Sequence, residues 1–128
     1  MNEQVDILLV EDSPSHAVQL QLLLQCAGYS VRVARDGVQG YWQACVKVPR
    51  LVLLDVDLPK LDGFQVLTHL KQYRVTTAIP VVMLTDRERH TDVTCAIALG
   101  ADDYLPKQDA PAQLCAVVQQ FLEARPPR

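Results

Sequence analysis

Five short apolar runs, each followed by a segment of helical periodicity, constrain the fold of this chain more than any other feature. Most of the runs lack the period-2 alternation of a half-exposed strand, as expected for strands that are covered on both faces. The repeated strand–helix order predicts a single α/β domain with a doubly wound, five-stranded parallel sheet and five helices. The predicted strands are Val5–Val10, Ser30–Ala34, Leu51–Leu54, Pro80–Leu84 and Asp103–Leu105.

Capping residues and glycines mark the ends of the predicted helices. Ser13 and Pro14 are typical of a helix start, and Gly28 is placed to end that helix. Gly100 is placed to end the fourth helix, and Asp109 is expected to cap the fifth. The third helix should run from Phe64 to about Tyr73. Helical spacing predicts buried faces formed by Val38, Tyr41, Trp42 and Cys45, by Val93, Ala96 and Ile97, and by Leu114, Val117, Val118 and Phe121.

Size and charge limit the classes of function that this chain can have. A chain of 128 residues can bury about two-thirds of its unfolded surface, which suffices for one core. Residues 1–124 are predicted to form that domain, and residues 125–128 a tail or the start of a linker. A net charge of -3 without a Lys/Arg run argues against binding to nucleic acid or to a membrane surface. No apolar run approaches the roughly 20 residues of a membrane span.

The cysteines, histidines and the tryptophan show no pattern of a cofactor site. Widely spaced Cys residues without a Cys-x-x-Cys pair predict reduced, partly buried thiols, and a start without a signal peptide predicts a cytoplasmic protein. Trp42 is expected on a core or semi-buried helix face rather than on a stacking platform. The cysteines are Cys26, Cys45, Cys95 and Cys115, and the histidines His16, His69 and His90 are expected at the surface.

Polar residues follow the predicted strands at the points where the strands end. Glu11 and Asp12 follow the first strand, Asp55 the third and Thr85 the fourth, and Lys107 lies beyond the fifth. These positions share the carboxyl edge of an open parallel sheet, where ligands bind at the topological switch point. Three neighbouring carboxylates repel one another, and a hard dication such as Mg2+, which prefers oxygen ligands, relieves the repulsion. The pattern therefore predicts a Mg2+ site at this edge.

The same residue types favour phosphoryl transfer. A carboxylate aimed at a metal-bound phosphoryl group can act as a nucleophile and form an aspartyl phosphate. Lys107 would neutralise the developing charge, and Thr85 would donate a hydrogen bond to a phosphoryl oxygen. Phosphoryl transfer depends mainly on positioning and charge stabilisation, so these groups suffice.

Five segments contain the predicted site residues and their neighbours. They are Ile-Leu-Leu-Val-Glu-Asp-Ser at 7–13, Ala-Arg-Asp-Gly at 34–37, Leu-Val-Leu-Leu-Asp-Val-Asp-Leu-Pro-Lys-Leu-Asp-Gly at 51–63, Pro-Val-Val-Met-Leu-Thr at 80–85 and Gly-Ala-Asp-Asp-Tyr-Leu-Pro-Lys at 100–107. Through these segments the chain resembles response-regulator receiver domains of two-component signalling, up to about residue 124. This resemblance implies a flavodoxin-like sheet with the strand order 2-1-3-4-5.

The resemblance also implies the roles of single site residues. Asp55 would be the phospho-acceptor. Asp12 would bind Mg2+ directly, Glu11 would act on it through water, and the backbone carbonyl of Asp57 would be a further ligand. The chain would then be a signalling switch with only self-phosphorylation and self-dephosphorylation chemistry, and not an enzyme that turns over a separate substrate.

A conformational switch and its partners follow from the same resemblance. Thr85 would move toward the phosphoryl group, and the ring of Tyr104 would turn inward. A histidine kinase or a phosphotransfer protein would supply the phosphoryl group. The face formed by the fourth helix, the fifth strand and the fifth helix would bind an output domain, an effector or a second phosphorylated copy.

Three positions depart from the family pattern. Asp86 stands where most members have a small residue, and Gln108 stands where a proline usually follows the lysine through a cis bond. A cis bond before a residue other than proline costs about 2.5–4 kcal/mol, so a trans bond is expected here. The third position is Asp57, which could form an ion pair with Arg87 across the mouth of the site and hinder attacking water.

Two other functions are compatible with parts of the pattern. Asp55-Val56-Asp57 after an apolar strand also fits a phosphatase of the haloacid dehalogenase type. That motif normally follows the first strand, however, and Glu11 and Asp12 would then have no role. A degenerate receiver that works as a docking module without phosphate is the second alternative. Asp86 and Gln108 favour it, and the complete set of acidic residues, together with Thr85 and Lys107, opposes it.

Overall fold

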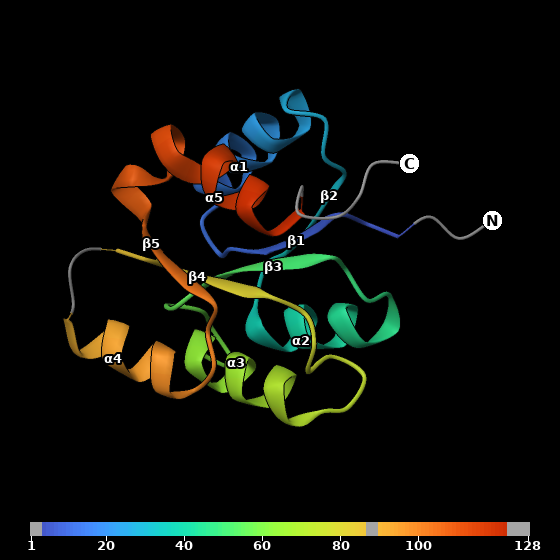
Figure 1. The fold of residues 1–128 in the computed structure, drawn as a ribbon, viewed down its shortest axis with the longest axis vertical. Helices are drawn as coiled ribbons and strands as arrows, with labels where there is room; N and C mark the ends of the chain where they lie inside the picture. Colours follow the sequence, from blue (N-terminus) through green and yellow to red (C-terminus); the bar gives the residue numbers. More distant parts are fainter. Residues whose placement is uncertain (1–3, 87–89, 123–128) are drawn as a thin grey trace.

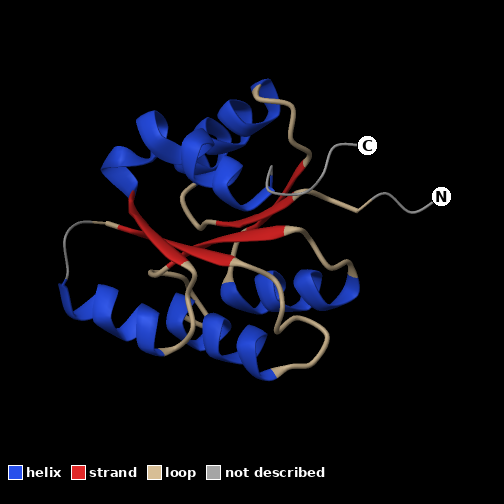
Figure 2. Cartoon of the chain, in the orientation of Figure 1, coloured by secondary structure: helices blue, strands red, loops and turns tan. Residues whose placement is uncertain are grey.

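The computed structural model describes residues 4–86 and 90–122, which form one five-stranded parallel sheet with helices on both faces (Figures 1 and 2). The strand order is β2-β1-β3-β4-β5, so the predicted fold class and order are confirmed. The strands are β1 (Ile7–Val10), β2 (Val31–Ala34), β3 (Leu51–Asp55), β4 (Val81–Thr85) and β5 (Asp103–Pro106). The helices are α1 (Pro14–Cys26), α2 (Gly37–Val46), α3 (Gly63–Gln72), α4 (His90–Ala98) and α5 (Ala110–Leu122).

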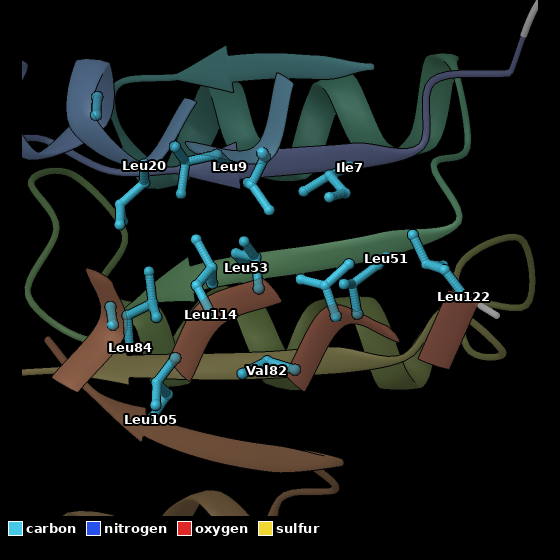
Figure 3. Close-up of a cluster of buried hydrophobic side chains, with 14 residues drawn as sticks. Ile7, Leu9, Leu20, Leu51, Leu53, Val82, Leu84, Leu105, Leu114 and Leu122 are labelled. Atoms are coloured by element: carbon cyan, nitrogen blue, oxygen red, sulfur yellow. The ribbon is translucent and has the colours of Figure 1, made fainter. Parts of the chain in front are cut away.

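Each face of the sheet has its own hydrophobic core. Helices α1 and α5 cover one face, and α2, α3 and α4 cover the other (Figure 1). Alternate residues of each strand point to opposite faces, so the three inner strands, β1, β3 and β4, are apolar up to the polar residues that end β3 and β4, as predicted. The edge strands β2 and β5 contain Arg32 and Asp103. The first core contains Ile7, Leu9, Leu51, Leu53, Val82 and Leu84 together with residues of α1 and α5 (Figure 3), and the second contains Leu8, Val10, Val52, Leu54, Val81 and Met83.

Side-chain caps fix the starts of three helices, close to the carboxyl edge of the sheet. The side chain of Ser13 accepts a hydrogen bond from the third residue of α1, and Asp36 does the same for α2. Asp62 and Gln65 form a capping box at the start of α3. The predicted start of the first helix is therefore confirmed. Asp109, expected as a cap, directly precedes α5 within a short 3-10 helix.

The predicted buried face of α2 is wrong in part. Its buried residues are Gly37, Gly40 and Ala44, whereas the predicted Val38 and Trp42 are exposed and Tyr41 and Cys45 are half-buried. A Cβ atom on Gly40 would lie 2.8 Å from the side chain of Val10, so glycine allows α2 to approach the sheet closely. The helical spacing holds, but close packing favours the face that carries the smallest residues.

Other surface predictions had mixed outcomes. Ile97 of α4 is exposed, although Ala96 beside it is buried as predicted. The four cysteines are free thiols, but Cys26 and Cys95 are exposed rather than partly buried. His16 and His69 are exposed as predicted, while the side chain of His90 and residues 125–128 lie outside the described part. Within residues 4–86 and 90–122, no helix has the length and apolar character needed to cross a membrane.

Candidate functional site

The predicted site residues lie at the carboxyl edge of the sheet. Glu11 and Asp12 directly follow β1, Asp55 ends β3, Thr85 ends β4, and Lys107 directly follows β5. Strands β1, β3, β4 and β5 are successive neighbours in the sheet. The fold therefore brings residues as far apart in sequence as Glu11 and Lys107 to one edge.

Lys107 links the two buried carboxylates of the site. Its Nζ donates hydrogen bonds to Oδ2 of Asp55 at 2.9 Å and to Oε2 of Glu11 at 3.2 Å. Asp55 is 2% exposed and Glu11 is 0% exposed, so both carboxylates are largely removed from water. Charge-assisted hydrogen bonds of this kind are the strong ones in proteins. Two buried acids thus share one ammonium, and the site keeps an excess of negative charge.

Backbone N–H groups hold both carboxylates in place. The N–H of Asp57 donates to Oδ1 of Asp55 at 3.1 Å, and the N–H of Ser13 donates to Oε2 of Glu11 at 3.1 Å. Neither donor was predicted from the sequence, which among the backbone groups indicated a role only for the carbonyl of Asp57. An Asp side chain that accepts from the N–H two residues on is an Asx turn. A strand that ends in Asp could have indicated this contact.

Gly63 is a structural residue of the site and the first residue of α3, one position before the helix start that the sequence predicted. Its N–H donates to the carbonyl of Val56 at 2.8 Å. A Cβ atom at this position would lie 2.3 Å from the carbonyl oxygen of Asp55. Only glycine allows the first residue of α3 to pack directly against the backbone of the acceptor.

The environment of Asp55 disfavours its charged form. Burial, together with the charge of Glu11, raises the pKa of Asp55 to about 7, although Lys107 and the N–H of Asp57 act in the opposite direction. Burial alone would lower the pKa of Lys107, but the hydrogen bond to Asp55 and the two carboxylate charges outweigh it and raise that pKa. An additional cation at this site would therefore favour the ionised form of Asp55.

The raised pKa of Asp55 predicts a pH dependence of stability in metal-free protein. The ordinary pKa of an aspartate is 3.8 and that of Asp55 in the folded protein is about 7, so the folded state binds more protons between these values. The contribution of Asp55 is therefore fully present below its unfolded pKa and is lost as the pH rises through its folded pKa. Urea unfolding in EDTA should show that Asp55→Asn gains stability relative to the native chain as the pH rises from 4 to 7. A difference that does not change with pH would contradict the assignment.

The remaining predicted residues are less closely tied to this centre. Asp12 is exposed, and Thr85 is almost fully buried at the end of β4. Tyr104 is half-buried on β5 and packs against the core on the side of α2, α3 and α4. Thr85 and Tyr104, the predicted switch residues, therefore lie on neighbouring strands, β4 and β5.

The carboxylate oxygens of the site are the kind of ligand that a hard dication such as Mg2+ prefers. Glu11 Oε1 is buried and has no hydrogen-bond partner among the described residues. A buried carboxylate oxygen of this kind is stabilised by a cation. In the described part of the chain, however, no three His, Cys, Asp or Glu side chains form a ready metal site. The predicted ligand set of Glu11, Asp12, Asp55 and the carbonyl of Asp57 stays a prediction.

The positions that depart from the family pattern have different outcomes. No peptide bond is cis in the described ranges, so the trans bond expected between Lys107 and Gln108 is confirmed. Asp86, which stands where most members have a small residue, is exposed. Asp57 is also exposed, but Arg87, its expected partner, lies outside the described residues.

A sequence model of the response regulator receiver domain matches residues 7–119. This chain belongs to the receiver domain family. It is 39% identical to the alkaline phosphatase synthesis transcriptional regulatory protein PhoP of Bacillus subtilis, over 91% of this chain and 48% of PhoP. The receiver domain thus spans about half the length of that relative.

Solved structures agree with this assignment. A putative response regulator from Chloroflexus aurantiacus has a TM-score of 0.89 and 32% identity, and the match covers 96% of this chain and all of that one (100%). The receiver domain of the sensor histidine kinase PA1611 from Pseudomonas aeruginosa has a TM-score of 0.86 and 28% identity, with 94% and 99% covered. That structure has a magnesium ion coordinated in its active site cleft.

Proposed function

We propose that this receiver domain accepts a phosphoryl group on Asp55 in a Mg2+-dependent reaction and transmits the change to a partner protein. The contact that supports this most directly is the 2.9 Å hydrogen bond from Lys107 Nζ to Asp55 Oδ2. Through this hydrogen bond the ammonium group of Lys107 lies next to the carboxylate, where negative charge would develop during phosphoryl transfer. The neighbouring Glu11 adds a potential metal ligand, its buried Oε1, which has no hydrogen-bond partner in the described part of the chain.

The reaction would be a nucleophilic displacement at phosphorus. A carboxylate oxygen of Asp55 attacks the phosphoryl group, a new P–O bond forms, and the bond to the donor breaks, with its electron pair leaving on the donor. The donor would be a phosphohistidine of a sensor histidine kinase or of a phosphotransfer protein. The N–H of Asp57 fixes the orientation of the attacking carboxylate, and Lys107 stabilises charge on the transferred group.

The residues that would hold Mg2+ are Glu11, Asp12, Asp55 and the backbone carbonyl of Asp57. When bound, Mg2+ would supply positive charge that offsets the repulsion between the carboxylates and the incoming phosphoryl group. The magnesium ion in the PA1611 receiver supports this choice of cation. Asp55 and Glu11 are buried and share the ammonium of Lys107, and charge interactions between groups removed from water are strong.

The output of the switch would be a change on the face formed by α4, β5 and α5. The covalent charge on Asp55 would attract the hydroxyl of Thr85, and Tyr104 would turn inward. Such a local electrostatic change shifts the population between two arrangements of the face. An output domain, an effector or a second copy would bind the shifted arrangement. The chain itself would turn over no separate substrate beyond the gain and loss of its own phosphoryl group.

Intact mass spectrometry with acetyl phosphate tests the proposed function. We expect the mass of one phosphoryl group to be added in the presence of Mg2+ and not in EDTA. No addition under either condition would favour the degenerate docking module. Steady turnover of a generic phosphate ester such as p-nitrophenyl phosphate would instead favour a phosphatase of the haloacid dehalogenase type.

We expect Asp86→Ala to be phosphorylated faster by small anionic donors than the native chain. Asp86 is exposed and directly follows Thr85 at the end of β4, so its carboxylate adds negative charge near the route of the donor. One exposed charge changes such an encounter by less than about 1 kcal/mol, which corresponds to a few-fold change in rate. Initial rates with acetyl phosphate at low and high salt would measure the effect, which should shrink at high salt. If Asp86→Ala and the native chain were phosphorylated at the same rate at low salt and also at high salt, the prediction would be wrong.

A further inference from the structure

The outer face of α2 carries a stripe of large apolar side chains. Val38, Trp42 and Val46 are 48%, 63% and 62% exposed. They are spaced four residues apart, and each such step turns about 40° around an α-helix. The three side chains therefore form one narrow stripe along the helix, roughly 12 Å long.

The buried contacts of α2 do not include these side chains. Helix α2 contacts the rest of the domain through the buried Gly37, Gly40 and Ala44 and through the half-buried Tyr41, which packs against the core. A Cβ atom on Gly37 would lie 2.0 Å from the carbonyl oxygen of Leu61, so the inner side of the helix is filled without the residues of the stripe. Single exposed apolar residues are normal, but a row of three that includes a tryptophan is typical of a protein interface.

The charges at the two ends of the stripe are positive. Helix α2 contains no Asp, Glu, Lys or Arg, and the exposed Arg35 and Lys47 flank its ends. Asp36, the acid that directly precedes the helix, is buried, caps the helix and lies 3.7 Å from Lys60. The chain as a whole has a net charge of -3, so this border differs in sign from the rest of the protein.

We propose that the stripe Val38–Trp42–Val46 is a docking surface for an amphipathic helix of a partner protein whose apolar face has acidic residues at both ends. A helix laid along such a stripe contacts it through apolar residues three or four apart. Its acidic ends would face Arg35 and Lys47. This surface differs from both the phosphorylation site and the α4-β5-α5 face.

Other occupants fit less well. In two copies paired through this stripe, whether parallel or antiparallel, the ends that carry Arg35 and Lys47 would meet like charges. An anionic membrane would match the charge, but a membrane needs a broad apolar surface and the stripe is narrow. The exposed Val18 and Leu22 do not extend it, because they belong to α1 on the opposite face of the sheet (Figure 1).

Trp42 is the single tryptophan of the chain, so its fluorescence reports directly on the stripe. The probe is a synthetic, tryptophan-free helical peptide with leucines three or four apart and glutamates at both ends of the leucine face. We expect it to shift the emission of Trp42 to shorter wavelengths, saturably and less strongly at high salt. The matched peptide with lysines in place of the glutamates should bind at least about ten-fold more weakly.

Two variants test the stripe and its border. Val46→Ser and Lys47→Glu should each weaken binding of the acidic peptide by about ten-fold, with unchanged circular dichroism. Leu22→Ser, which changes an equally exposed leucine on α1, should leave binding intact. Equal binding of both peptides, or no shift with either, overturns the proposal. The proposal is also overturned if phosphatidylglycerol vesicles shift the emission of Trp42 and the acidic peptide does not. The same holds if sedimentation shows a dimer in which the emission of Trp42 is already shifted without peptide.

Discussion

Asp55→Asn should gain no phosphoryl group from acetyl phosphate and Mg2+ under conditions in which the native chain gains one. Asparagine has the shape of aspartate, but its single amide oxygen can accept only one of the two hydrogen bonds that Lys107 and the N–H of Asp57 donate to the two oxygens of Asp55. A neutral amide is a poor nucleophile toward phosphorus, and it would also bind a dication more weakly. Phosphorylation should therefore fall below detection, a loss of more than about 100-fold.

A matched carboxylate provides the control for this experiment. Asp102 precedes β5 at the opposite edge of the sheet, where it pairs with Lys71 and accepts a hydrogen bond from the N–H of Val81. The Asp102→Asn variant should be phosphorylated to the same extent as the native chain, because the charge that it loses lies at the other edge of the sheet from Asp55. Phosphorylation that survives in Asp55→Asn, with the added mass located elsewhere, would contradict the assignment of the acceptor.

The main lines of the fold and of the site could be predicted because both follow from strand order. A parallel sheet gathers the residues at its strand ends along one edge, so Glu11, Asp55, Thr85 and Lys107 could be placed there without coordinates. The apolar character of the strands predicted helices on both faces. These inferences depend on topology and not on distances, and the structure confirms the fold and places all four residues at that edge.

Features that depend on close packing could not be predicted in the same way. Periodicity placed Trp42 on a buried face, although small residues make the actual contact of α2 with the sheet. The N–H donors of Ser13 and Asp57 depend on the local turn after each strand. The raised pKa of Asp55 depends on how deeply its carboxylate is buried. In each case the sequence shows the residue type, while a distance of a few ångströms decides its role.

Gly63→Ala is expected to destabilise the domain strongly and to disturb the acceptor at the same time. The new methyl group would lie 2.3 Å from the carbonyl oxygen of Asp55 and 2.7 Å from Cα of Val56. Both neighbours are backbone atoms of a buried strand and its exit, so they cannot move aside as a flexible side chain can. Overpacking of a tight interior costs typically 1–3 kcal/mol, and a clash with backbone belongs at the upper end, about 3 kcal/mol.

The control variant is Gly28→Ala, which replaces a glycine by alanine without a steric clash. Gly28 has a φ of 98° and no atom of the described residues within 4 Å of its would-be Cβ, so alanine there suffers only backbone strain, about 1–2 kcal/mol. Gly63 does not have a positive φ, and its cost should come from the close approach alone. Urea unfolding of both variants would measure the difference, and the phosphorylation rate should fall in Gly63→Ala but not in Gly28→Ala. If Gly63→Ala proves no more destabilising than Gly28→Ala, α3 does not pack against the acceptor backbone as closely as described.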